Sequence, residues 1–118
     1  RVDAPGVAGV VVLGAAYKLD IDDVRESPAM DVIGLLKQKG ALVEYHDPYI
    51  PHIHHEYDGW QMDSVKDMMK SVKEADAVVV VTDHKVYDYK TIIESAKFVF
   101  DSRNATGKLG KFANVERL

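Results

Sequence analysis

The sequence predicts a three-layer α/β domain in which helices cover both faces of a mostly parallel sheet of four or five strands. Two observations support this fold class. Four short apolar runs show no alternation between apolar and polar residues, which is typical of strands buried on both faces. Segments with the apolar spacing of helices lie between these runs. Such alternation of strand and helix indicates parallel pairing through right-handed crossovers.

The predicted strands are rich in valine and bounded by polar residues or glycine. They cover residues 7–13, 41–45, 77–81 and 97–100. A sheet of four strands is small, so we expect a fifth strand or a neighbouring domain beside it. Residues 48–63 form the longest irregular segment, and the tail after residue 103 shows no clear pattern.

Helices are predicted in each interval between strands. Ser27 can cap the first helix, with Pro28 at its first position and Gly40 as its C-terminal stop. Ser64 can cap the second, whose apolar residues follow the i, i+3, i+4, i+7 spacing of one helical face. The third and shortest covers residues 88–96.

Length, charge and composition exclude several classes of protein. A chain of 118 residues is too short for a two-domain enzyme, so we expect residues 1–118 to form one domain. The net charge of −4 argues against sequence-independent binding of nucleic acid, and no run approaches the roughly 20 apolar residues of a membrane span. The absence of cysteine excludes disulfides, thiolate metal sites and a cysteine nucleophile within this chain. We expect a cytoplasmic protein, and because the chain opens on Arg1, a piece of a longer one.

Polar side chains gather where the predicted strands end, and ligands of open α/β sheets bind outside this edge. Lys18, Arg25 and Arg103 are cations at these positions. Cations near helix N-termini suit a ligand that carries phosphate. Arg25 is explained more simply as an ion-pair partner of the aspartates in its own loop. Lys18 and Arg103 are therefore the stronger candidates for ligand contact.

Other candidate motifs do not have the spacing that their chemistry requires. Gly9 and Gly14 do not form the G-x-G-x-x-G fingerprint of a dinucleotide site. Asp47 precedes a proline and is interpreted as a turn residue. The histidines of residues 52–56 lack metal-ligand spacing and fall in a predicted surface loop. The sequence thus predicts no catalytic residue and no metal site.

Several spaced motifs, in one order along residues 7–105, resemble a known family. They include an aromatic-lysine pair after the first strand, a D-x-R-x-S-P segment before the first helix and an Asp-Pro pair after the second strand. A D-x-R-N motif ends the pattern. Their residues here are Gly14, Ala16, Tyr17, Lys18, Asp23, Arg25, Ser27, Pro28, Gly40, Asp47, Pro48, Asp101, Arg103 and Asn104. The pattern resembles the C-terminal, UDP-binding domain of the UDP-glucose/GDP-mannose dehydrogenase family. It is most similar to the dehydrogenases of UDP-N-acetylglucosamine and UDP-N-acetylmannosamine.

The resemblance implies a Rossmann-like domain that binds the UDP part of a UDP-sugar within a larger enzyme. In such enzymes an N-terminal domain binds NAD, and a central helical region joins the two halves and builds a homodimer. The implied reaction oxidises the sugar 6-hydroxyl group to a carboxylate with two NAD, through a cysteine that lies outside the C-terminal domain. We therefore expect NAD to bind to a domain absent from this chain, and this chain alone to be inactive.

The resemblance also assigns roles to individual residues. Tyr17 and Lys18 match an aromatic-lysine pair near the nucleotide sugar, and Arg103 matches an arginine that reaches it. The residues to which a loop-ordering role is assigned are Asp23, Arg25, Ser27, Asp101 and Asn104.

Two other functions fit a small doubly wound sheet. A phosphoacceptor signalling domain needs an acidic pair after the first strand, where this chain has Gly14 and Ala15. A non-catalytic interaction or dimerisation module is the stronger alternative, although Lys18 and Arg103 argue against it. Trp60 either covers an apolar patch or contacts another domain, and the loop around residues 52–55 is a second candidate for such a contact.

Overall fold

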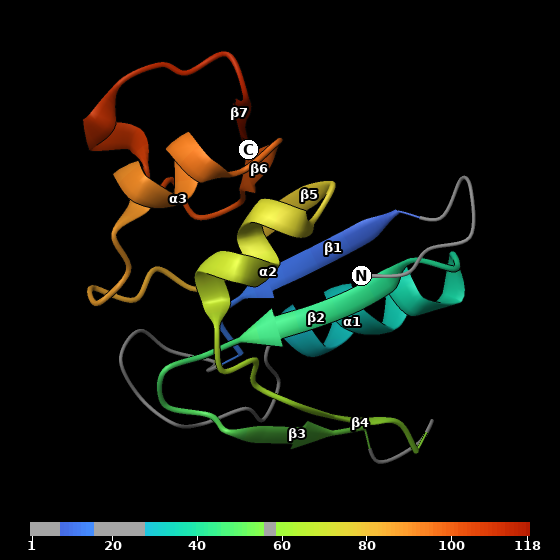
Figure 1. Cartoon of the computed structure of the whole chain (residues 1–118). Coiled ribbons are helices and arrows are strands. Elements are labelled where there is room, and N and C mark those ends of the chain that lie inside the picture. Colours follow the sequence, from blue (N-terminus) through green and yellow to red (C-terminus); the bar gives the residue numbers. More distant parts are fainter. Residues whose placement is uncertain (1–7, 16–27, 56–58) are drawn as a thin grey trace.

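The computed structural model describes residues 8–15, 28–55 and 59–118 (Figure 1). The strands are β1 (Gly9–Leu13), β2 (Leu42–His46), β3 (His52–His54), β4 (Gln61–Asp63), β5 (Ala77–Val80), β6 (Val99–Asp101) and β7 (Val115–Arg117). The helices are α1 (Pro28–Gln38), α2 (Met68–Glu74) and α3 (Tyr89–Ser95), followed by a 3₁₀ turn at Gly107–Leu109. Within these described segments, no helix has the length and apolar character to cross a bilayer.

Five strands form one sheet in the order β2-β1-β5-β6-β7, and each neighbouring pair is parallel. This confirms the predicted α/β class and parallel pairing. From β1 the chain first adds β2 on one side, and then adds β5, β6 and β7 on the other. The strand order therefore reverses between β1 and β5, which is where open sheets of this class form their ligand crevice.

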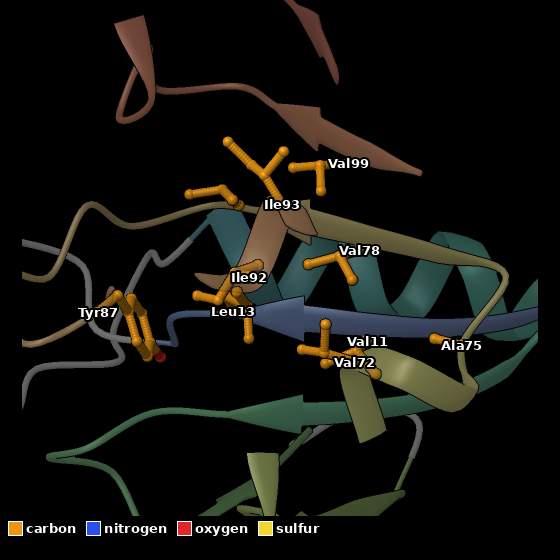
Figure 2. Close-up of a cluster of buried hydrophobic side chains, with 10 residues drawn as sticks. Val11, Leu13, Val72, Ala75, Val78, Tyr87, Ile92, Ile93 and Val99 are labelled. Atoms are coloured by element: carbon orange, nitrogen blue, oxygen red, sulfur yellow. The ribbon is translucent and has the colours of Figure 1, made fainter. Parts of the chain in front are cut away.

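The two faces of the sheet carry separate apolar clusters. In Figure 1, α2 and α3 lie in front of the sheet and α1 lies behind it. Val11 and Leu13 of β1 belong to the cluster under α2 and α3, which Figure 2 shows in close-up. Val12, between them in sequence, belongs to the cluster under α1. Burial on both faces explains why β1 is an unbroken apolar run.

The second helix begins later than Ser64, the predicted cap. It starts at Met68, and the side chain of Asp67 caps it by accepting a hydrogen bond from the Lys70 amide at 3.1 Å. The Ser64 hydroxyl instead accepts a hydrogen bond from the Asp47 amide at 3.0 Å. Ser64 therefore ties the incoming loop to the end of β2, so its side chain is not available as a cap.

Two strand features lie in segments without a clear sequence pattern. β3 and β4 form an antiparallel hairpin inside residues 48–63, the segment predicted to be irregular. β7 comes from the tail and supplies the fifth strand of the main sheet. The side-chain amide of Asn114 donates hydrogen bonds to the carbonyls of Ile93 (2.9 Å) and Ala96 (3.1 Å), and so holds the tail against the end of α3.

Candidate functional site

The carboxyl ends of the parallel strands meet at one edge of the sheet, which we call the carboxyl edge. Its residues are Gly14 and Ala15 after β1, Asp47 after β2, Thr82 and His84 after β5, and Asp101, Arg103 and Asn104 at the end of β6. The point at which the strand order reverses, between β1 and β5, lies within this set. By the general rule for open α/β sheets, the carboxyl edge is the candidate ligand site.

Gly14 brings the backbone of the β1 exit into close contact with the β5 exit. Its φ is +99°, and a Cβ built at this position would lie 2.5 Å from the Cβ of Thr82 and 2.8 Å from the Thr82 amide nitrogen. The Gly14 amide also donates a hydrogen bond to the His46 carbonyl at 2.8 Å. Only glycine fits both the backbone conformation and the space.

Asp101 organises the loop that follows β6. Its side chain is fully buried and accepts hydrogen bonds from the amides of Arg103 (3.1 Å), Ala105 (3.0 Å) and Thr106 (2.8 Å), and from the Thr106 hydroxyl (2.6 Å). Burial raises the pKa of Asp101, but these hydrogen bonds outweigh it and leave the pKa below its usual value. The buried charge is therefore compensated by the loop backbone, which it fixes in place.

Arg103 projects from this ordered loop into solvent. Its amide is held by Asp101, and its side chain is exposed. Its guanidinium forms no hydrogen bond or ion pair with any other residue in the described part of the chain. Next to it, Asn104 has a φ of +56°, and its side chain packs so tightly on Gly107 that a Cβ built there would clash with the Asn104 Oδ1. The loop thus presents one available cation from a rigid turn.

Asp47 has a larger role than the predicted turn. One carboxylate oxygen, Oδ1, does accept hydrogen bonds from the amides of Tyr49 (2.8 Å) and Ile50 (3.2 Å), as a turn residue would. The other, Oδ2, lies 2.6 Å from the Ala15 amide nitrogen and 2.8 Å from His84 Nε2. The side chains of Asp47 and His84 are both fully buried. This pair joins the ends of β1, β2 and β5.

A second polar pair lies beside the first. The Tyr87 hydroxyl donates to the His46 carbonyl at 3.0 Å and also lies 3.0 Å from His46 Nδ1. Burial lowers the pKa of His46, and His84 lowers it further, while Asp47 opposes them. Burial also raises the pKa of Tyr87. Both side chains are therefore neutral near pH 7, which suits a hydrogen bond between uncharged groups.

The structure places the predicted site residues in two groups. Asp101 at the end of β6 lies together with Arg103 and Asn104 on the loop that follows. The others lie outside the described residues: Tyr17, Lys18, Asp23, Arg25 and Ser27. Sequence reasoning missed the Asp47–His84 pair. Each residue follows a strand, but only the strand order, which places β1 between β2 and β5, brings the two together.

The histidines of residues 52–55 lie on or directly after β3, in the hairpin that forms a sheet separate from the five-stranded one. His52 Nδ1 is 2.7 Å from an oxygen of Asp63 on the opposite strand, and both side chains are exposed. No group of three or more metal-ligating side chains could hold an ion among the described residues. Trp60 packs against the cluster under α1, with its ring 5.5 Å from Lys37 Nζ, so it covers an apolar patch.

Comparison with known proteins identifies the family. Residues 11–108 match the model of the UDP binding domain of the UDP-glucose/GDP-mannose dehydrogenase family. The chain belongs to this family. It therefore has the UDP-binding domain expected from the sequence motifs.

Members of the family with similar sequences act on different sugars. The chain is 35% identical over 105 residues to a UDP-N-acetyl-D-mannosamine dehydrogenase of Pyrococcus horikoshii, and 31% identical over 101 residues to a UDP-glucose 6-dehydrogenase of Bacillus subtilis. These alignments cover 85% and 80% of this chain but 22% of each relative. This chain thus spans about a fifth of their length.

Solved structures of the family have the same fold. The structure of the UDP-N-acetyl-mannosamine dehydrogenase from Staphylococcus aureus superposes with a TM-score of 0.66 at 29% identity. The match covers 96% of this chain and 26% of that one. The Rossmann-like architecture predicted from the sequence is confirmed.

Proposed function

We propose that the carboxyl edge of this domain holds the diphosphate of a UDP-sugar and that Arg103 contacts it. The observation that supports this most strongly is the setting of Arg103. Its exposed guanidinium extends from a loop that buried Asp101 fixes, at the edge where parallel sheets bind ligands. A guanidinium can donate two hydrogen bonds to one phosphate group, and a fixed loop reduces the entropy lost on binding.

We propose Tyr17 and Lys18 as further contacts, because their segment follows β1, whose end lies where the strand order reverses. In this proposal Asp23, Arg25 and Ser27 order that segment, as Asp101 and Asn104 order the loop after β6. Residues 1–118 would then act as one nucleotide-sugar-binding domain of a longer protein.

The carboxyl edge does not fit NAD. A dinucleotide-binding domain uses an acidic residue at the end of its second strand to hold the ribose hydroxyls. Asp47 has that position, but it is buried and its oxygens accept hydrogen bonds from Ala15, Tyr49, Ile50 and His84. It has no exposed oxygen to offer a ribose. NAD is therefore assigned to another part of the full-length protein.

In the full-length protein, this domain would serve an NAD-dependent nucleotide-sugar 6-dehydrogenase, active as a cytoplasmic homodimer. The proposed reaction oxidises the 6-hydroxyl group of a UDP-N-acetylhexosamine to a carboxylate. The part of this domain in that reaction is to hold the nucleotide, so that the sugar is oriented toward catalytic groups elsewhere. This chain alone would not reduce NAD.

A titration of the isotopically labelled chain with UDP, followed through backbone amide shifts, tests the binding site. We expect shifts for Gly14, Ala15 and the amides of residues 101–106, and none for the β3–β4 hairpin. Uridine should produce smaller shifts at equal concentration, because it lacks the diphosphate that Arg103 would bind.

Weak binding is expected, since this chain spans about a fifth of the length of its relatives. Titration should therefore extend to millimolar UDP. If the backbone amide signals of the carboxyl edge do not shift at that concentration, the proposed site is contradicted. It would instead favour an interaction or dimerisation module, which a measurement of molar mass in solution would detect.

A further inference from the structure

The geometry points to Asp47 and His84 as positioning residues for UDP binding, which act by fixing the Ala15 amide at the exit of β1. This inference rests on the proposed function and adds two residues to it. Neither side chain is exposed, so neither can touch the ligand in this arrangement. They would act through the Ala15 backbone at the carboxyl edge.

One carboxylate oxygen of Asp47 contacts both β1 and the residues after β5. Oδ2 of Asp47 lies 2.6 Å from the Ala15 amide nitrogen and 2.8 Å from His84 Nε2. An ionised carboxylate only accepts hydrogen bonds, so Nε2 of His84 carries the proton in this contact. The oxygen therefore joins an amide at the end of β1 to a ring at the end of β5, across the point where the strand order reverses.

Two aromatic rings shield the Asp47–His84 pair. The ring of Tyr49 meets the ring of His84 edge-on at 5.2 Å, and the ring of Tyr87 does so at 5.7 Å. In such a dry setting, hydrogen bonds are strong and a missing partner is costly. Removing the His84 donor would leave the Asp47 charge less compensated, and its oxygen would be less fixed relative to Ala15.

Stability alone does not explain the Asp47–His84 pair. Buried ionic or polar pairs can often be replaced by apolar residues of similar volume with little loss of stability. What an apolar pair cannot do is hold a backbone amide in one direction. Ala15 lies at the exit of β1, where the strand order reverses, so the direction of its amide fixes the backbone at the proposed binding edge.

Two variants that replace His84 with an amide side chain distinguish the positioning of the Ala15 amide from simple packing. The side-chain nitrogen of glutamine in His84→Gln can take the place of Nε2, while that of asparagine in His84→Asn is too short to reach Oδ2. His52→Leu is the matched control, because it removes a histidine that pairs with an aspartate at 2.7 Å on the exposed hairpin. Each variant is titrated with UDP, and its backbone amide shifts and hydrogen exchange are recorded.

We expect His84→Asn to weaken UDP binding by about tenfold, to shift the Ala15 amide and to increase its exchange rate. His84→Gln should restore all three properties, and His52→Leu should change none of them. If His84→Asn folds and binds UDP as tightly as the unchanged chain does, the inference is overturned. If His84→Asn does not fold, His84→Leu provides the same comparison against His84→Gln.

The amide data also separate this inference from the proposed function. A chain that does not bind UDP at all would contradict the proposed function. In that case the amide signals of residues 15–18 decide the positioning role without ligand. Changes in His84→Asn that His84→Gln reverses would support the role, and unchanged signals would overturn it.

Discussion

At the scale of single residues, two buried carboxylates order the carboxyl edge. Asp47 and Asp101 each accept hydrogen bonds from several backbone amides, and this compensates a charge that would otherwise be costly to bury. The sequence marks both as polar residues after apolar runs. It does not reveal their burial, because that depends on loops that fold back over each carboxylate. Because the sequence does not show this burial, it predicted only a turn residue at Asp47.

Gly14 gives a residue-scale prediction. Gly14→Ala should lower the free energy of unfolding by about 3 kcal/mol, because the new Cβ meets Thr82 and the positive φ is unfavourable for alanine. Gly34→Ala is the matched control. Gly34 lies in α1 with no atom within 4 Å of its would-be Cβ, so this change should stabilise by about 0.5–1 kcal/mol. Chemical denaturation measures the free energy of unfolding of both variants. Equal changes in the two would contradict the close approach of Gly14 to Thr82.

At the scale of elements, apolar patterns predicted the core of most elements better than their ends. The runs of β1 and β5 were recognisable because both faces are buried. The start of α2 was not recognisable from the sequence, since Ser64 and Asp67 are both good capping residues. The choice depends on a contact with Asp47 that is distant in sequence. β3, β4 and β7 have three residues each, which is too few for a periodic signal.

The cap of α2 gives a prediction at this scale. Asp67→Ala should lower the free energy of unfolding by about 1 kcal/mol, because the Lys70 amide loses its acceptor in a helix of seven residues. Asp67→Asn should stay near the unchanged chain, since asparagine caps comparably well. Urea unfolding of the three proteins tests this. If the alanine and asparagine variants have the same free energy of unfolding, the assignment of Asp67 as the cap is wrong.

At the scale of the whole molecule, parallel topology brings distant segments to one edge. Strand and helix alternation predicted this edge, and the motif resemblance predicted the family, which the comparisons confirm. Strand order could not be derived from local pattern, so the contact of Asp47 with His84 was not foreseen. The roles of Tyr17 and Lys18 still rest on resemblance and position in sequence. Arg103 is the ligand candidate whose surroundings the structure describes.

The central claim is that Arg103 binds the diphosphate of UDP at the carboxyl edge. Its most direct test is the UDP affinity of Arg103→Ala beside that of Lys97→Ala. Both variants remove one positive charge, but Lys97 lies before β6, at the opposite edge of the sheet, 3.9 Å from Asp76. We predict that Arg103→Ala weakens binding by about tenfold or more, the effect of one charge-assisted hydrogen bond. Lys97→Ala should bind UDP as the unchanged chain does. Equal affinities for the two variants would contradict the claim.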